Sequence, residues 1–257
     1  NHRYLPGRIQ MVASIQVISG NVSAAGSYYV ALYYPGQEQG TWFGDAAPLL
    51  GLTKNVKKDT FQKLLCGQSP SGTQLVKQVS IKNNRQSENK HASERPQMVE
   101  KKKLNVLGVD QTDSVEKGLS VLWASSNAAR RKKIEACVLR ASDGKNRWIE
   151  KNLKLARRGR NGQRRISSKL VGASFLHTIS RAGEPQLHVH NVFSQMVYGE
   201  DGRWSKLDTK QLHAWTPTIG RIFRANLARE LIKEFGLELV RPKDEHGKVK
   251  SWFTIAG

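Results

Sequence analysis

The sequence is consistent with a single domain of the α+β class. Its 257 residues, 38% of them hydrophobic, are enough to bury one large core. Short runs of β-branched and alternating apolar residues predict strands, and apolar residues three and four positions apart predict helices. We therefore expect residues 1–257 to form one domain, with an N-terminal extension over residues 1–10.

The first half of the chain is expected to contain two strands and a short helix. Met11 to Ile18 is apolar and β-branched, which predicts a strand, and Lys54 to Leu65 predicts a helix that ends before Gly67. Gln68 to Lys103 is polar and nearly free of aromatic residues, so we expect a flexible insertion within the domain. Leu104 to Thr112 predicts the next strand.

The middle of the chain predicts a basic helix and a basic hairpin. Apolar spacing from Leu119 to Val138 predicts a helix, which we expect to end at Asp143 and Gly144. Arg157 to Arg165 contains two glycines and an asparagine, which is typical of a hairpin tip. The positive charges of such a loop could hold a DNA backbone.

The last third of the chain predicts a long amphipathic helix after a pair of strands. Val171 to Ser180 and Gln186 to Val197 predict the two strands. Pro217 is expected to open a helix that Gly236 closes, and two short strands, Leu237 to Val240 and Val249 to Thr254, follow.

Composition restricts the classes of partner and compartment. Lys and Arg number 42 against 21 for Asp and Glu, a formal charge of +21 that favours a polyanionic partner. For single-stranded nucleic acid, each phosphate contact adds roughly −0.7 to the slope of log binding constant against log salt concentration. Binding should therefore weaken as salt is added. Ribosomal, membrane-surface and heparin-binding proteins share such a charge, so charge alone does not select among them.

Two cysteines exclude a disulfide scaffold and a four-thiolate zinc site, which favours a reducing cytoplasm. No stretch reaches the ~18 apolar residues of a membrane span, so no membrane insertion is expected. Residues 1–10 lack the apolar segment of a signal peptide, and the absence of an initiating methionine predicts that the chain is a fragment.

Three histidines form a candidate metal site. Strand alternation places His188 and His190 on one face, and a hairpin turning through Gly183 to Pro185 would bring His177 beside them. Three neutral imidazoles leave positions for water or a phosphate oxygen, which is typical of a catalytic metal. The alternative, three ordinary strand histidines, is favoured for an isolated His-x-His pair but not when a third histidine joins it.

Four tyrosines supply candidate nucleophiles. Tyr28, Tyr29, Tyr33 and Tyr34 form two adjacent pairs, and a phenol with a pKa near 10 needs a base or cation to attack phosphorus. The alternative is aromatic packing at helical spacing, although adjacent pairs point in different directions and should leave a phenol exposed. Asp110, near the end of a predicted strand, could orient a ligand histidine or accept the tyrosine proton.

These segments resemble the relaxase domain of the conjugative relaxase–helicase family, MobF-type members of the HUH endonucleases. The most specific parts are Phe175 to Arg181 and Glu184 to Asn191, which are similar to the family's three-histidine signature. Val109 to Lys117 resembles the family's Asp-Leu-Thr-Phe-Ser-Ala-Pro-Lys-Ser strand, which carries the active-site aspartate onto Asp110. Similarity also extends to Thr41–Phe43, Leu49–Leu52, Gly202–Asp208 and Gly220–Phe235.

The resemblance implies a fold, a cofactor and a reaction. The fold would be a central antiparallel sheet flanked by helices, with His177, His188 and His190 holding a divalent cation, magnesium or manganese foremost, with zinc, nickel or cobalt also compatible. A tyrosine, Tyr28 foremost, would nick one DNA strand through a 5′-phosphotyrosyl bond. Tyr33 or Tyr34 would be candidates for a second strand transfer.

The implied partner is single-stranded DNA of a transfer origin, with a hairpin, in a bacterial cytoplasm, and a helicase domain would follow in the full-length protein. Phosphate contacts and base stacking would come from six residues: Trp42, Lys117, Arg157, Arg158, Arg160 and Arg181.

The chain also departs from the family pattern. Gln111, Asp113 and Glu116 stand where the family has Leu, Phe and Pro, so we expect two additional carboxylates beside the metal site. Only three residues separate the tyrosine pairs, which weakens the case for a second catalytic tyrosine. Two alternatives stay open: an inactive single-strand DNA-binding descendant, and a rolling-circle initiator, which usually places its tyrosine after the histidines.

Overall fold

The computed structural model describes residues 13–20, 40–53, 55–77, 79–82, 103–180, 182–250 and 252–256. Within them seven antiparallel strands form one sheet, in the order β1-β4-β8-β7-β2, with β3 paired to β4 and β9 paired to β8. The sheet strands are β1 (Ala13–Gly20), β2 (Thr41–Phe43), β3 (Val79–Lys82), β4 (Lys103–Ser114), β7 (Ser168–Ile179), β8 (Pro185–Gly199) and β9 (Trp204–Lys206).

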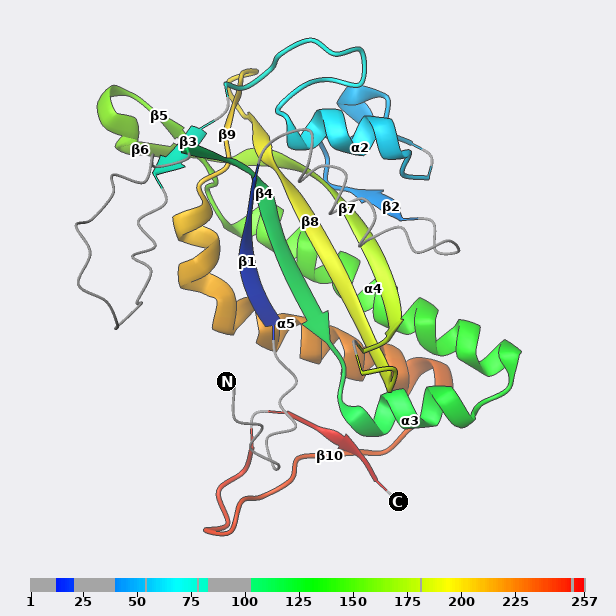
Figure 1. The fold of residues 1–257 in the computed structure, drawn as a ribbon. Coiled ribbons are helices and arrows are strands. Elements are labelled where there is room, and N and C mark those ends of the chain that lie inside the picture. Colours follow the sequence, from blue (N-terminus) through cyan, green and yellow to red (C-terminus); the bar gives the residue numbers. More distant parts are fainter. Residues whose placement is uncertain are drawn as a thin grey trace, which may run out of the picture.

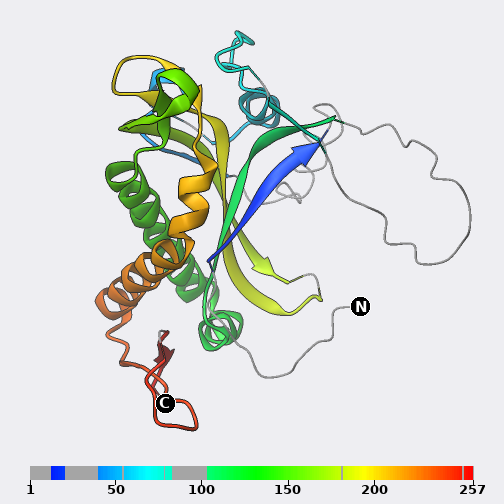
Figure 2. The same cartoon turned by 90° about the vertical axis from the view of Figure 1, so that its left-hand side faces the viewer.

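Helices cover the two faces of the sheet unequally (Figures 1 and 2). Two long helices, α4 (Ala128–Asn152) and α5 (Thr209–Phe235), lie against one face, which we call the rear face. The short helix α2 (Lys58–Leu65) lies over one end of the other, the front face. Helix α3 (Lys117–Ser125) connects β4 to α4. The expected fold, a central antiparallel sheet flanked by helices, is confirmed.

The remaining elements are small. A two-stranded hairpin, β5 (Ala156–Arg158) with β6 (Arg164–Ile166), projects from one end of the sheet (Figure 1) and carries the 3-10 turn η2 (Arg160–Gly162) at its tip. Another, β10 (Leu239–Val240) with β11 (Thr254–Ile255), lies near the C-terminus. The 3-10 helix η1 spans Pro48–Leu50.

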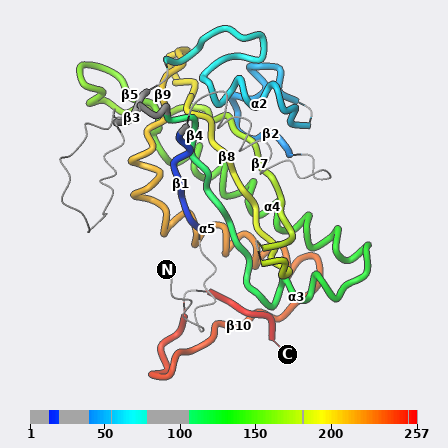
Figure 3. Tube along the Cα trace, viewed as in Figure 1, coloured from blue at the N-terminus to red at the C-terminus, as the bar shows by residue number. Residues whose placement is uncertain are grey.

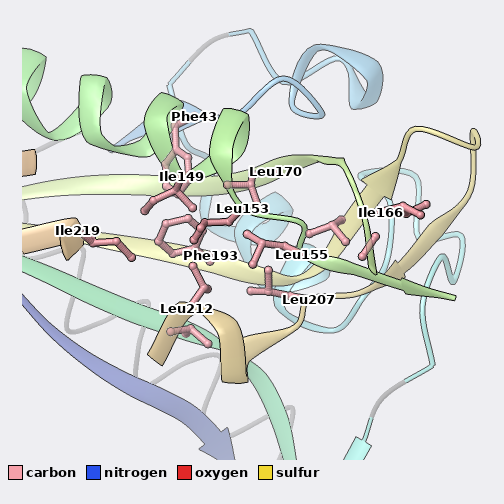
Figure 4. Packing of buried hydrophobic residues seen from close by; sticks show 13 residues of the cluster. Phe43, Ile149, Leu153, Leu155, Ile166, Leu170, Phe193, Leu207, Leu212 and Ile219 are labelled. Carbon is pink, nitrogen blue, oxygen red and sulfur yellow. The ribbon is translucent and has the colours of Figure 1, made fainter. Parts of the chain in front are cut away.

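Apolar side chains of the rear face form the main core. Figure 4 shows Phe193 of β8 among side chains from α4 and α5, including Ile149, Leu153, Leu212 and Ile219, all of them buried. Each large side chain buried there stabilises the fold by roughly 1.5–3 kcal/mol. This core joins segments far apart in sequence, as does the pairing of β1 with β4 along the tube in Figure 3.

The apolar pattern predicts one helix after β4 that ends at Asp143 and Gly144, and both parts of this prediction are wrong. The chain forms two helices, because the Asn127 side chain accepts a hydrogen bond from the Arg130 backbone N–H at 2.9 Å and so begins α4. Helix α4 then continues through Asp143 and Gly144. A Cβ on Gly144 would lie 3.0 Å from the Asn226 amide nitrogen, so this glycine serves close packing of α4 on α5 and does not end the helix.

The predicted start of the last helix at Pro217 is also wrong, since α5 begins at Thr209. Pro217 lies inside the helix, where its missing N–H leaves the His213 carbonyl without its usual donor. The Thr216 hydroxyl donates to that carbonyl at 2.9 Å and replaces the lost bond. Helix α5 bends visibly in its first half (Figure 1), the usual effect of an interior proline.

Part of the predicted insertion, residues 68–103, belongs to the fold. Val76 is buried against α2, the Gln74 amide donates to the Val76 carbonyl at 2.7 Å, and β3 pairs with β4. These segments are therefore a packed turn and a strand. Residues 83–102 lie outside the described part of the chain, as does the predicted extension over residues 1–10.

Candidate active site

Three histidine side chains converge at one end of the front face. His177 lies on β7 and directly opposite His188 of β8, and His190 follows two residues later on the same face. Their ring centroids are 4.9 to 5.3 Å apart, and one nitrogen from each ring lies within 4.8 Å of the others. The predicted proximity of the three imidazoles is confirmed.

Hydrogen bonds orient two of the rings. The Nδ1 atom of His188 lies 2.9 Å from the Gln186 carbonyl oxygen, and Nδ1 of His190 lies 2.8 Å from Oδ2 of Asp110. Both oxygens only accept, so each Nδ1 carries a proton, and Nε2 is the nitrogen of each ring that could coordinate a ligand. This contact is the geometry that an orienting role of Asp110 requires, and the role itself stays a prediction.

Burial and mutual repulsion keep the imidazoles of His177 and His188 neutral. Burial, reinforced by the neighbouring imidazoles of His190 and His188, lowers the pKa of His177 to about 4. Burial also lowers the pKa of His188. A neutral imidazole is the form that coordinates a metal ion, whereas a protonated one repels it.

This donor set fits a divalent cation. Three imidazoles within reach of one point match the ligand number of catalytic metal sites, and an outer carboxylate such as Asp110 commonly fixes a ligand histidine. Imidazole nitrogens suit several divalent metals, so the ligands leave the identity of the metal open.

The sheet surface beside the histidines is polar and open. Ser14 and Gln16 of β1 are exposed, and Thr112 and Ser114 of β4 are half-buried, all four on the front face. The Thr112 hydroxyl lies 3.2 Å from Nδ1 of His190. Sequence reasoning missed Thr112, although its position two residues after Asp110 on a strand places it on the same face.

A family model described as TrwC relaxase matches residues 14–257. The chain belongs to this family. It is 29% identical over 242 residues to the multifunctional conjugation protein TraI of Escherichia coli strain K12, covering 89% of this chain, and 28% identical over 232 residues to a second Escherichia coli TraI, covering 85%. The chain spans 12% of the length of each of these relatives.

Solved structures of the conjugative relaxase TrwC share the fold. A metal-free complex of TrwC with OriT DNA has a TM-score of 0.67 and 26% identity, covering 95% of this chain and 74% of that one. A metal-bound complex of TrwC with OriT DNA also gives 0.67 and 26%, covering 95% of this chain and 75% of that one. Among the open alternatives, a rolling-circle initiator gains no support from these comparisons.

The prediction of two additional carboxylates beside the histidines is wrong. Asp113 alternates with Thr112 along β4 and so faces the rear, where it is fully buried and pairs with Lys145 at 2.9 Å. Glu116 accepts a hydrogen bond from the Leu119 backbone N–H at 3.1 Å and begins α3. Neither carboxylate therefore adds negative charge to the histidine cluster of this relaxase-family domain.

Two of the predicted DNA-contacting residues flank the front face. Trp42 of β2 is half-buried and packs on Phe61 of α2, with ring centroids 6.5 Å apart. Lys117 lies at the other end of the face, where its ammonium contacts Glu184 at 2.8 Å and the Pro185 carbonyl at 3.2 Å. Lys117 thus ties α3 to the β7–β8 turn, next to the histidines.

The β5–β6 hairpin contains the predicted basic cluster. Arg158 binds both carboxylate oxygens of Asp201 at 2.7 Å, and Arg157 donates to the carbonyls of Gly162 and Asn161. Arg157 therefore stabilises the hairpin itself, and Arg158 anchors the hairpin to the turn between β8 and β9, while Arg160 at the tip is exposed. The pair with Arg158 lowers the pKa of Asp201 to about 2.

A cavity of about 550 Å³ lies between this hairpin and the sheet. Among the described residues, its lining includes the cationic side chains of Arg157, Lys206 and Lys210 and one carboxylate, that of Asp208. The four tyrosines Tyr28, Tyr29, Tyr33 and Tyr34, and Arg181, lie outside the described residues, so their positions relative to the histidines stay predictions.

None of the described helices combines the length and the apolar character needed to cross a bilayer.

Proposed function

We propose that this chain is the DNA-nicking domain of a conjugative relaxase, a site- and strand-specific transesterase acting on single-stranded DNA of a transfer origin. The observation that carries the proposal is the convergence of three imidazoles, two of them with their Nδ1 protons held, on an open polar sheet face. Family membership and the OriT DNA complexes of TrwC support the choice of substrate.

His177, His188 and His190 would hold a divalent cation, which withdraws charge from the oxygens of the scissile phosphate when bound. Asp110 holds the Nδ1 proton of His190 and thereby fixes the orientation of that ring. The Gln186 carbonyl does the same for His188. The protein contributes ligands that are already oriented before DNA binds.

The proposed reaction exchanges one phosphodiester for another. The phenolic oxygen of a tyrosine, Tyr28 foremost, attacks the phosphorus while the bond from phosphorus to the 3′ oxygen breaks. The phenol loses its proton to a base, and the departing 3′ oxygen takes one up, leaving a 5′-phosphotyrosyl bond and a free 3′-hydroxyl. Because the bonds broken and formed are of the same kind, the step is nearly isoenergetic and reversible.

The proposed DNA path combines phosphate contacts with base stacking. Arg160 at the hairpin tip and the cationic cavity below it are suited to the phosphates of a DNA hairpin, with Arg157 and Arg158 shaping that surface. Trp42, Lys117 and Arg181 are proposed contacts for the strand that reaches the histidines. A helicase domain in the full-length protein and a bacterial cytoplasmic location remain parts of the same proposal.

The test is covalent capture of DNA. The protein is mixed with manganese or magnesium and a pool of single-stranded oligonucleotides that carry a hairpin followed by randomised nucleotides, then denatured. We expect a denaturant-resistant adduct that Tyr28→Phe abolishes, because only the phenolic oxygen is removed. Tyr198→Phe is the matched control, since Tyr198 packs edge-on against Trp204 near the opposite end of β8 from the histidines and should leave the adduct intact.

The other outcomes discriminate among the remaining readings. An adduct that survives Tyr28→Phe would assign the nucleophile to Tyr29, Tyr33 or Tyr34. Salt-sensitive binding of the oligonucleotides with no adduct at all would contradict a nicking enzyme and leave a DNA-binding descendant.

A further inference from the structure

A sealed polar network lies directly behind the histidines. Seven side chains on the rear face and on α4 form this rear polar network, and none is more than 9% exposed: Gln111, Asp113, Ser142, Lys145, Asn146, Ser174 and Asn191. At its centre Lys145 of α4 and Asp113 of β4 form an ion pair at 2.9 Å, with both side chains at 0% exposure. Lys145 also donates to the Gln111 side-chain oxygen.

Asn191 is the hub of this network. Its amide nitrogen donates to Asp113 Oδ2 at 2.9 Å, and its oxygen accepts from the Ser174 hydroxyl at 2.8 Å. The same oxygen accepts from Asn146 at 2.8 Å and from Ser142 at 3.0 Å. One side chain of β8 is therefore bonded to β4 on one side, to β7 on the other and to α4 above.

The hub lies level with the metal ligands. Asn191 directly follows His190, and it is opposite Gln111 on β4 and Ser174 on β7. On the front face, Asp110 must meet His190 at 2.8 Å for the ligand ring to be oriented. A slip of two residues between β4 and β8 would move these groups by roughly 7 Å and would break contacts on both faces.

The network is poorly explained as a source of stability alone. Burying two charges costs several kcal/mol per ion, and apolar side chains of similar volume often stabilise a core as well or better. A buried ion pair instead favours one arrangement of the elements that carry it, because any other arrangement leaves a buried charge without its partner. Burial lowers the pKa of Lys145, and the charges of Asp113 and, less strongly, Asp110 act in the opposite direction.

We propose that Asn191 and the Lys145–Asp113 pair are positioning residues for the histidine site: they hold β7, β8 and β4 in the one register that brings His177, His190 and Asp110 together. The inference rests on the proposed function, because it treats the histidines as metal ligands. The network touches neither the metal nor the DNA, and acts only through strand position.

The test separates register from stability. In the double variant Asp113→Leu with Lys145→Met both charges are replaced by apolar groups of similar size, so we expect the fold to persist. Titration with Mn²⁺ should show an affinity lower by about 10-fold or more, the range found when outer partners of a metal site are lost. The double variant Asp113→Asn with Lys145→Gln, a neutral hydrogen-bonded pair, should recover most of the affinity.

Two further variants distinguish a change in Mn²⁺ affinity from a loss of stability. Ser174→Ala removes only the bond from β7 to Asn191 and should lower Mn²⁺ affinity severalfold with the denaturation midpoint nearly unchanged. Leu212→Ala creates a cavity in the core next to Phe193 and should lower the midpoint while leaving Mn²⁺ affinity alone. Wild-type affinity in both the folded Leu/Met double variant and Ser174→Ala would overturn the proposal.

A readout without metal keeps this inference distinct from the proposed function. Imidazole ¹⁵N NMR of the metal-free protein should show His188 and His190 with the proton on Nδ1. We expect the Leu/Met double variant to lose that single tautomer at His190, because Asp110 is no longer held opposite it. Failure of the wild-type protein to bind Mn²⁺ would contradict the proposed metal site, whereas an unchanged His190 tautomer in the double variant would contradict the positioning role.

Discussion

His190 and Asn191 are neighbours on β8, yet they serve opposite faces of the sheet. On the front, one nitrogen from each of three imidazoles converges on a common point. On the rear, polar groups of similar number donate to and accept from one another and are sealed from water. The comparison teaches that polar strand residues indicate a binding site when their ligand atoms converge on one point, whereas polar residues that bond mainly to one another hold strands and a helix together.

The largest effect is expected from breaking the rear pair on one side only. Lys145→Met leaves the Asp113 carboxylate buried without its cation, which should lower the free energy of unfolding by about 3–5 kcal/mol in a urea titration. The matched control is Lys151→Met, an exposed lysine near the end of the same helix, expected to change it by less than about 0.5 kcal/mol. Equal effects of the two variants would show that the rear pair has no special role.

On the front face, Asp110→Asn should affect ligand binding rather than folding. The amide no longer carries the charge that holds the Nδ1 proton of His190, so Mn²⁺ affinity should fall by about 10- to 100-fold while the denaturation midpoint of the metal-free protein changes little. Asp143→Asn on the exposed side of α4 supplies the control, with wild-type affinity. A large drop in the denaturation midpoint of Asp110→Asn, like that expected for Lys145→Met, would contradict the difference between the two faces.

Acid should lower the stability of the metal-free protein, because His177 and His188 on the front face become protonated. The pKa values of His177, about 4, and of His188 are depressed in the folded state, so the unfolded chain binds more protons once the pH falls below about 6.5. The stability associated with neutral rings is therefore present above pH 6.5 and lost as the pH falls toward 4. Melting temperatures between pH 7 and 4 should fall less steeply in His177→Gln; identical slopes would assign the acid sensitivity to other groups.

The smallest effect is expected where both partners face solvent. The Lys117–Glu184 pair lies at the β7–β8 turn, and its side chains are 37% and 62% exposed. Water and salt screen such a pair, so Glu184→Gln should leave the denaturation midpoint within experimental error. A clear loss would mean that the β7–β8 turn depends on this contact for its position.

The sequence was most informative where a local pattern has one structural solution. The His-x-His alternation, the turn at Gly183 to Pro185 and the preceding strand led directly to the imidazole cluster, because a tight hairpin leaves little choice of partner strand. Asp110 was found through its resemblance to a family strand. Pro217 and Gly144 misled prediction because their usual meaning was overridden, by the Thr216 hydroxyl and by close helix packing respectively.

By itself, the sequence determined which strand residues share a face, where the hairpins turn and that the surface is strongly basic, since these follow from backbone periodicity and side-chain charge. Only the tertiary structure decided that Asp113 forms an ion pair with Lys145, and that Arg158 forms one with Asp201. Such pairings depend on which helix covers which face and on how closely it packs. Those choices are made by the free energy of the whole core, and no local pattern contains them.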